Sequence, residues 1–404
     1  MSDSAQAPQA AAFPAIARPA IHQLQPSKIR AVANAAIGRE NVLPFWFGEP
    51  DEVTPQFIRD AAAHSLASGE TFYSHNYGIQ PLREALCAYL SSLHSPCDFG
   101  NVALTSSGVS ALMLIAQALY SPGDRVVCVT PLWPNITQIP KALGVEPVRV
   151  GLEFDDTAGW RLDLQKLLDA LTPGTRAVLI NSPNNPTGWT MTRAEQQTVL
   201  DHCRKHGIWI ISDDAYARLS FDETPKYAAP SFFDLCGYEE RVVSASTFSK
   251  SWLMTGWRMG WVAGPTSFVH DIGKLIEYNT SCIPVFVQRA GVAALTQGDH
   301  VIAHTRTRMM RARDVLAAHL ATIPGVIAPA APGAMYAFFR IVGLTDSVAL
   351  AKRLVEEAGL GLAPGAAFGP EGEGFLRWCF AAEDDKLADG ADRLRRFLVA
   401  NPAA

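Results

Sequence analysis

The sequence lacks several features that would place it among common classes of protein. It has no run of basic residues, and its 34 Lys and Arg against 39 Asp and Glu give a net charge of −5. This balance argues against a nucleic-acid-binding surface. No apolar run approaches the length needed to cross a bilayer. No Gly-x-Gly-x-x-Gly opens a helix after a strand, so a dinucleotide-binding enzyme is disfavoured.

Cysteine pairs are also missing. The seven cysteines are odd in number, widely spaced and form no Cys-x-x-Cys, so the sequence predicts neither a disulfide framework nor a metal site. The first residues have no basic start followed by an apolar segment, which a signal peptide would need. We therefore expect a flexible tail over residues 1–14 and a cytoplasmic location.

The chain is long and apolar enough for more than one compact unit. It has 404 residues, of which 48% are hydrophobic, and this length predicts two or three units. We expect an N-terminal segment over residues 15–50 that packs with a small domain, a large domain over 51–285, and the small domain over 286–404.

Short apolar segments alternate with helical patterns through the large domain. Segments of this kind that alternate with helices predict a mostly parallel sheet with helices on both faces, an α/β fold. From residue 301 the pattern changes to a basic helix and isolated strands, which is typical of a smaller α+β domain. The expected strands of the large domain are 102–107, 125–130, 146–150, 177–181, 208–212 and 241–246.

Polar or glycine-containing turns follow five of these strands. In an open parallel sheet, ligands bind beyond the carboxyl ends of the strands. Any one of these turns is more often a plain connection, but the five together predict a single ligand site. They are 107–109, 131–133, 184–188, 213–216 and 247–250.

Two side chains in the last of these regions suggest which ligand binds. A buried lysine such as Lys250 can form a Schiff base with an aldehyde, and an arginine such as Arg258 fits a phosphate. An aldehyde and a phosphate together indicate pyridoxal phosphate. The ring nitrogen of that cofactor must stay protonated beside a carboxylate, which Asp213 or Asp214 can supply.

The other turns offer groups for the rest of the cofactor. Asn185 and Tyr216 can donate to the ring oxygen, and Trp133 can stack on the ring. A helix start after a strand presents free backbone N–H groups to a phosphate. The expected phosphate site consists of Ser107, Gly108, Val109, Thr247 and Arg258.

In these segments the sequence resembles the class I/II aminotransferases, which are fold-type I pyridoxal-phosphate enzymes. The resemblance runs from about residue 25 to the end of the chain. Its most specific marks are Ser182-Pro-Asn-Asn-Pro-Thr-Gly188, Ser212-Asp-Asp-Ala-Tyr216, and Ser249-Lys250 followed by Met254-Thr-Gly-Trp-Arg258. Supporting marks are Gly48-Glu-Pro-Asp51, Tyr73 with Gly78, Pro332-Gly-Ala-Met-Tyr336 and Leu376-Arg-Trp378.

The resemblance implies a role for several residues. It implies that Lys250 carries the cofactor as a Schiff base and that Asp213, rather than Asp214, pairs with the ring nitrogen. It implies that Arg377 binds the substrate α-carboxylate, with help from Asn185 and the Gly48 backbone. It further implies a homodimer with shared active sites, in which Tyr73 reaches the phosphate of the neighbouring subunit. The expected activity is amino transfer from an L-amino acid to a 2-oxo acid by a ping-pong mechanism.

Three questions stay open at this stage. A C–S β-lyase would use the same scaffold, and a cofactor-binding sensor without catalysis is a remote alternative. The amino acid donor is also undetermined. The apolar Trp46 and Phe47 favour a neutral or aromatic side chain, and no arginine for a distal carboxylate can be assigned among Arg30, Arg39 and Arg289.

Overall fold

The computed structural model describes residues 16–222 and 227–401. The predicted tail over residues 1–14 lies outside these ranges. A seven-stranded sheet forms the centre of the large domain, in the order β2-β10-β9-β8-β7-β3-β4. Only β10 runs antiparallel to its neighbours in this sheet. The strands are β2 (Val102–Thr105), β3 (Arg125–Thr130), β4 (Val148–Gly151), β7 (Thr175–Asn181), β8 (Trp209–Asp213), β9 (Val242–Thr247) and β10 (Gly260–Ala263).

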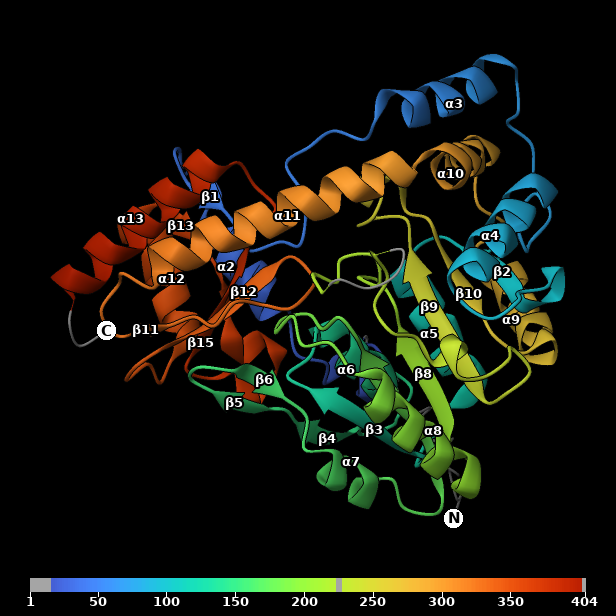
Figure 1. The fold of residues 1–404 in the computed structure, drawn as a ribbon, viewed down its shortest axis with the longest axis horizontal. Helices are drawn as coiled ribbons and strands as arrows, with labels where there is room; N and C mark the ends of the chain where they lie inside the picture. Colours follow the sequence, from blue (N-terminus) through green and yellow to red (C-terminus); the bar gives the residue numbers. More distant parts are fainter. Residues whose placement is uncertain (1–15, 223–226, 402–404) are drawn as a thin grey trace, which may run out of the picture.

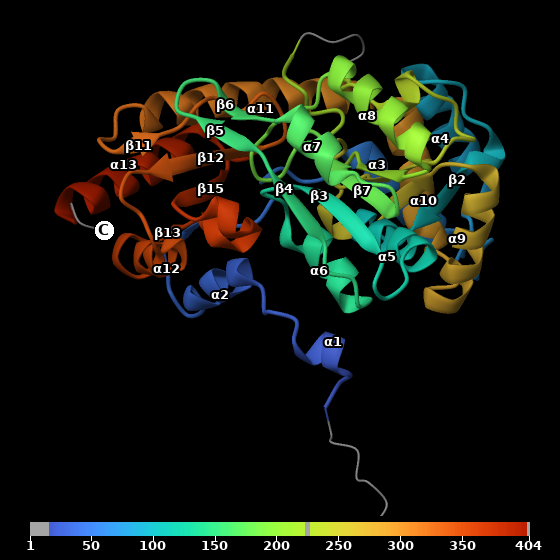
Figure 2. The ribbon, with the colours of Figure 1, turned by 90° about the horizontal axis from the view of Figure 1, so that it is seen from below.

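Helices cover both faces of this sheet, as Figures 1 and 2 show. Alternate residues of a strand point to opposite faces. Accordingly, Val126 and Cys128 pack with α5, α6 and α9, whereas Val127 and Val129 belong to the core under α4, α7 and α8. The helices are α3 (Gln56–Ala67), α4 (Gln80–Leu93), α5 (Gly108–Leu119), α6 (Pro134–Ala142), α7 (Leu164–Ala170), α8 (Arg193–His206), α9 (Thr266–Asn279) and α10 (Val285–Gln297).

The small domain is built on a four-stranded antiparallel sheet in the order β11-β12-β15-β14. The N-terminal segment joins it, because β1 (Leu43–Pro44) pairs in parallel with β13 (Leu360–Gly361), and α2 (Lys28–Ala35) packs beside α12 (Figure 2). The other elements of this domain are β11 (Val326–Ile327), β12 (Tyr336–Ile341), α12 (Ser347–Ala358), β14 (Ala363–Pro364), β15 (Phe375–Cys379) and α13 (Asp384–Ala400). The short helix α1 (Pro19–His22) contacts α6 of the large domain instead.

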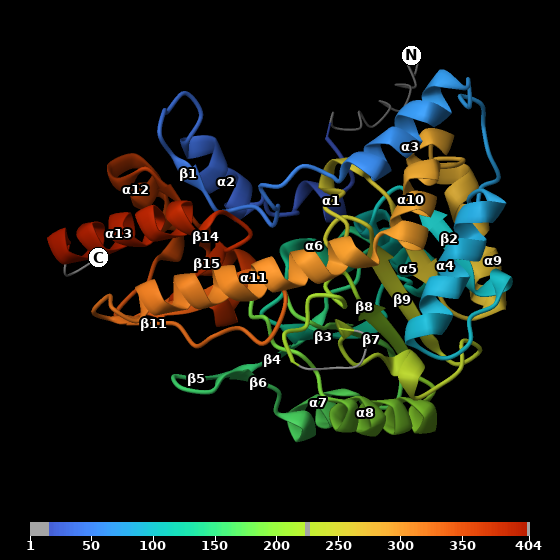
Figure 3. The same ribbon diagram turned by 45° about the horizontal axis from the view of Figure 1, so that its top comes forward.

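One long helix, α11 (Asp299–Leu320), connects the two domains (Figure 3). Its first turns place Val301 and Ile302 in the large-domain core, and its later turns place Met309 and Leu316 in the small-domain core. The division of the chain at residue 285 stays a prediction. Helix α10, which the sequence assigned to the small domain, packs in the large-domain core.

The α/β class and the mostly parallel sheet are confirmed, and two of the features that were not predicted concern the strands. One is β10, whose four residues directly follow the stretch interpreted as part of the phosphate site. The other is a hairpin of β5 (Glu153–Asp155) and β6 (Gly159–Arg161). Within the described ranges, no helix is both long and apolar enough to cross a membrane.

Candidate active site

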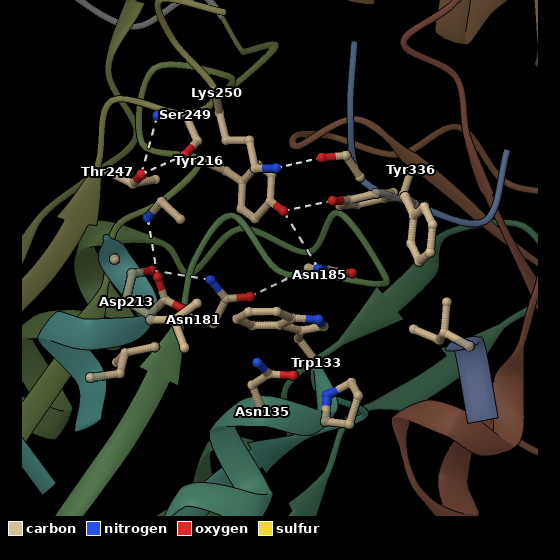
Figure 4. Close-up of a pocket in the computed structure, with 18 of the residues that line it drawn as sticks. Trp133, Asn135, Asn181, Asn185, Asp213, Tyr216, Thr247, Ser249, Lys250 and Tyr336 are labelled. Atoms are coloured by element: carbon tan, nitrogen blue, oxygen red, sulfur yellow. Dashed lines mark hydrogen bonds between the residues drawn. The ribbon is translucent and has the colours of Figure 1, made fainter. Parts of the chain in front are cut away.

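A cavity of about 390 Å³ lies where the carboxyl ends of the large-domain strands meet the small domain. Eleven of the thirteen predicted site residues line it, and Figure 4 shows several of their side chains facing the same space. Those eleven are Gly48, Gly108, Val109, Trp133, Asn185, Asp213, Tyr216, Thr247, Lys250, Arg258 and Arg377.

The other two predicted residues lie outside the cavity lining. Ser107 is buried beside it as the N-cap of α5, and its hydroxyl oxygen accepts a hydrogen bond from the Ser110 amide. Tyr73 is 90% exposed on the surface, next to the similarly exposed Phe72.

Lys250 lies in the turn after β9, and its side chain enters the cavity (Figure 4). Its Nζ donates a hydrogen bond to the carbonyl oxygen of Gly48, which comes from the N-terminal segment. Burial lowers the pKa of this amine to about 8, because the charged form loses its hydration. The neutral form of this amine is therefore more accessible near physiological pH than that of an exposed lysine.

Asp213 ends β8, Asp214 follows it, and their side chains point in opposite directions. Asp213 lines the cavity, where one carboxylate oxygen accepts a hydrogen bond from the Ala215 amide at 3.2 Å. Asp214 instead accepts from the hydroxyls of Ser212 and Ser244, away from the cavity. Burial raises the pKa of Asp213 to about 7, so its ionised form needs a positive partner to be stable at neutral pH.

A chain of polar groups crosses the floor of the cavity (Figure 4). The Asn181 side chain donates to the Asp213 carbonyl at 3.1 Å and accepts from the Asn185 amide at 2.7 Å. The side-chain nitrogen of Asn185 lies 3.5 Å from the Tyr216 hydroxyl, which lies 2.6 Å from the Tyr336 hydroxyl. These contacts fix the orientation of the side chains that face the cavity.

Arg377 reaches the cavity from β15 of the small domain and is 2% exposed. It donates to the Asn185 side-chain oxygen at 2.9 Å and to the Trp46 carbonyl. Its guanidinium also lies over the rings of Tyr336 and Phe368, 4.4 and 4.9 Å from their centroids. Its buried Nε has no hydrogen-bond partner among the described residues. A buried donor of this kind calls for an acceptor from a ligand.

Several hydrogen-bond donors surround the opposite end of the cavity. Helix α5 begins at Gly108, so the amides of its first turn are free of helical partners. Thr247 accepts from the Ser249 amide at 3.1 Å, and its hydroxyl lies 2.8 Å from that of Ser249. Arg258 adopts a left-handed conformation with φ of 52° and lines the same end. This end of the cavity is suited to an anion.

The comparisons with known proteins identify the family. Residues 40–394 match the model of aminotransferase class I and II. The chain belongs to this family. It is 31% identical to an aspartate aminotransferase of Pyrococcus horikoshii, over 92% of this chain and 94% of that protein. It is also 31% identical to an aromatic-amino-acid aminotransferase of Thermococcus litoralis, over 94% of this chain and 97% of that protein.

A solved structure shares the fold of this aminotransferase. The aspartate aminotransferase of Thermus thermophilus with maleate superposes with a TM-score of 0.86 at 27% identity, covering 94% of this chain and 99% of that chain. Enzymes of the family depend on pyridoxal phosphate. The chain is therefore a pyridoxal-phosphate-dependent aminotransferase, as the sequence predicted.

The residues present in the aminotransferase fit this cofactor. The cavity offers an amine, a carboxylate and a free helix N-terminus, which match an aldehyde, a ring nitrogen and a phosphate. The backbone approaches other groups closely at two glycines of the cavity. A Cβ on Gly48 would lie 1.9 Å from the Tyr336 hydroxyl oxygen, so Tyr336 would have to shift, and one on Gly108 would make a tight contact of 3.2 Å with Thr247 Cβ. Within the described part of the chain, no cluster of three or more His, Cys, Asp or Glu side chains could hold a metal ion.

Some cavity residues were not predicted to have a role. Asn181 ends β7, and nothing in its local sequence distinguishes it from other strand ends. Tyr336 was noted only as part of a supporting motif, although its hydroxyl meets that of Tyr216. Asn135 and Ser249 also line the cavity. Of the three arginines considered for a distal carboxylate, only Arg30, from α2, lines it.

Proposed function

We propose that Lys250 is the amine that takes up the cofactor aldehyde and later moves the substrate proton. Two observations support this: its partly buried side chain lies in the cavity, and its pKa is lowered to about 8. When bound, pyridoxal phosphate supplies the aldehyde and a ring that withdraws electrons from the substrate Cα. The neutral Nζ of Lys250 then accepts the Cα proton, as a general base whose pKa lies near the operating pH.

Asp213 is the proposed partner of the ring nitrogen. Its buried carboxylate needs a positive charge to remain ionised, and a protonated ring nitrogen supplies one. The Ala215 amide donates to this carboxylate, and the Asn181 side chain holds the backbone carbonyl of Asp213. Asn185 and Tyr216 are proposed to donate to the ring oxygen, with Tyr336 orienting the Tyr216 hydroxyl.

The anion-binding end of the cavity is the proposed phosphate site. The Gly108 and Val109 amides, the Thr247 hydroxyl and the Arg258 guanidinium provide neutral and charged donors together. Ser107 contributes by capping α5.

Trp133 is the proposed stacking partner of the cofactor ring. It lines the cavity at the start of α6, and its backbone amide donates a 2.9 Å hydrogen bond to the Asn185 carbonyl. This bond ties the position of the indole to the strand end that carries Asn185. An aromatic face held in this way offers a planar surface to a planar ring.

Arg377 is the proposed site for the substrate α-carboxylate. Its unpaired Nε and its fixed position over two aromatic rings support this role, because a guanidinium binds a carboxylate through parallel hydrogen bonds. Asn185 and the Gly48 backbone complete this end of the site.

The cavity wall beside Gly48 is the proposed binding surface for the substrate side chain. Ile29, Trp46 and Phe47 line it, which favours an apolar or aromatic amino acid. Arg30 stands at the same wall with its guanidinium 5.0 Å from the centre of the Phe47 ring, and it could also accept a distal carboxylate. Arg289 is paired with Glu70 instead, and neither it nor Arg39 lines the cavity.

A homodimer with shared sites is the proposed assembly. Tyr73 and Phe72 are highly exposed apolar residues, as is Tyr278, which is 89% exposed. Large apolar side chains that gather on a surface favour a protein partner. A cytoplasmic location is proposed from the seven cysteines, all of which are free.

The proposed substrate range is tested by mixing the purified holoenzyme with single amino acids and recording the absorbance of the cofactor. We expect aromatic and apolar amino acids to convert the aldehyde form to the amine form. Conversion by aspartate and glutamate should depend on Arg30, so that Arg30→Gln loses it and Arg39→Gln, the matched control, retains it. Conversion by aspartate and glutamate alone would contradict the apolar-wall proposal. Release of ammonia without any 2-oxo acid would favour the lyase alternative.

A further inference from the structure

Asp214 is a buried acid that the proposed chemistry does not use. It lies directly after Asp213 and points to the other side of the sheet. There it lines a second, small cavity of about 30 Å³, which has room for about one or two water molecules. Thr247 lines both cavities, so the small one lies immediately behind the proposed cofactor site.

The surroundings of Asp214 are built to hold a carboxylate. The Ser212 hydroxyl donates to one of its oxygens at 2.6 Å, and the Ser244 hydroxyl donates to the other. Its backbone is also fixed, because its amide donates to Ala245 and its carbonyl accepts from Ser246. Hydroxyl donors on both oxygens stabilise the charged form against the cost of burial.

Charged and titratable groups face Asp214 from several elements. His94, at the end of α4, lines the small cavity and is paired with Asp234 at 2.7 Å. Arg218 and Tyr89 line the same cavity. Burial raises the pKa of the Asp214 carboxyl, the two serines and His94 oppose that rise, and Asp234 adds to it.

The two aspartates act on each other electrostatically. Burial has the largest effect on the pKa of Asp213, followed by the Ala215 hydrogen bond and then by the negative charge of Asp214, which raises that pKa. The same negative potential acts on any group that Asp213 contacts. A positive charge on such a group is stabilised by it, most strongly where water is excluded.

We propose that Asp214 is a positioning residue whose buried negative charge, from behind Asp213, favours the protonated form of the cofactor in the aminotransferase site. This inference rests on the proposed role of Asp213. Asp214 touches neither cofactor nor substrate. Its charge acts on Asp213 and on the cofactor across the end of β8.

The test is a pH titration of the cofactor absorbance in the holoenzyme. Replacing Asp214 by Asn keeps the shape of the side chain and removes its charge. We expect the pH midpoint of the absorbance change to fall by about half a unit to one unit relative to the wild type. Asp214→Glu, the matched control, keeps the charge and should keep most of the midpoint.

Two results would overturn the proposal. One is an unchanged midpoint in Asp214→Asn, which would mean that Asp214 only stabilises the local structure through its hydrogen bonds. The other is an equal shift in the Asn and Glu variants. If Asp214→Asn does not fold, Asp214→Ala replaces it, because it removes the same charge: the midpoint should again fall, and no shift there would also refute the idea. A wild type that shows no pH-dependent absorbance would instead count against the proposed roles of Lys250 and Asp213.

Discussion

Replacing Arg377 by Ala removes the only described guanidinium that enters the cavity from the small-domain sheet. The wild-type side chain is 2% exposed and is held by Asn185 and the Trp46 carbonyl. Truncating one partner of a buried, hydrogen-bonded charge pair costs about 2–5 kcal/mol. We therefore expect kcat/KM for an amino acid to fall by about 30-fold to several thousand-fold.

Two variants and one substrate analogue make this prediction specific. Arg377→Lys keeps the charge and loses the planar geometry, so its activity should lie between those of the wild type and the Ala variant. Arg340→Ala, on the neighbouring β12 but paired with Asp156 near the surface, is the matched control and should retain activity. The analogue is the amine that lacks the α-carboxylate, tested in single-turnover assays.

The analogue isolates the interaction with the carboxylate. The wild type should lose most of its rate with the amine, whereas Arg377→Ala should lose little more than it has already lost. Equal losses in both proteins would refute the assignment of Arg377 to the α-carboxylate. So would a kcat/KM within about two-fold of the wild type in a folded Ala variant, with folding checked by thermal unfolding.

Two further predictions concern the cavity. In the cofactor-free protein the pKa of Asp213 is about 7, above its value of 3.8 when exposed. Because an acid with a raised pKa in the folded state binds its proton more tightly there, the free energy of unfolding falls as pH rises between these two values. Asp213→Asn should therefore stabilise the cofactor-free protein by up to about 4 kcal/mol at about pH 8 and by almost nothing at about pH 4. Calorimetry at both pH values checks this, and an equal effect at the two would contradict it. Gly48→Ala should lower activity at least about 10-fold, because the new Cβ would collide with the Tyr336 hydroxyl. Gly237→Ala is the matched control, because a Cβ there meets no atom within 4 Å. Equal activity of the Gly48 variant in a steady-state assay would show that the site tolerates the shift.

The sequence was most informative about the large domain, because its strands could be ordered along the chain and their carboxyl ends carry the polar residues. Trp133, Asn185 and Asp213 follow three different strands, and the parallel sheet brings them to one cavity. The direction of the Asp213 and Asp214 side chains was open from local sequence. Alternation along β8 resolves it, since only one of two adjacent residues can face the cavity.

Contacts between distant segments were less accessible. The hydroxyls of Tyr216 and Tyr336 meet across 120 positions of sequence, and Arg377 reaches the cavity from an apolar strand whose own pattern favours a structural role. The strand β10 was missed because it follows closely on the turn that contains Arg258, in a stretch interpreted only as a ligand site. Periodicity describes single elements, whereas these features depend on how elements pack.

The role of Lys250 is tested by the absorbance of the purified protein with pyridoxal phosphate, compared between the wild type and Lys250→Ala. We expect the wild type to show the absorbance of a cofactor covalently joined to the protein and to catalyse amino transfer. The variant should show only free or loosely bound aldehyde and no turnover, while Lys274→Ala, on the exposed surface of α9, behaves as the wild type. Normal absorbance and turnover in Lys250→Ala would contradict the central claim.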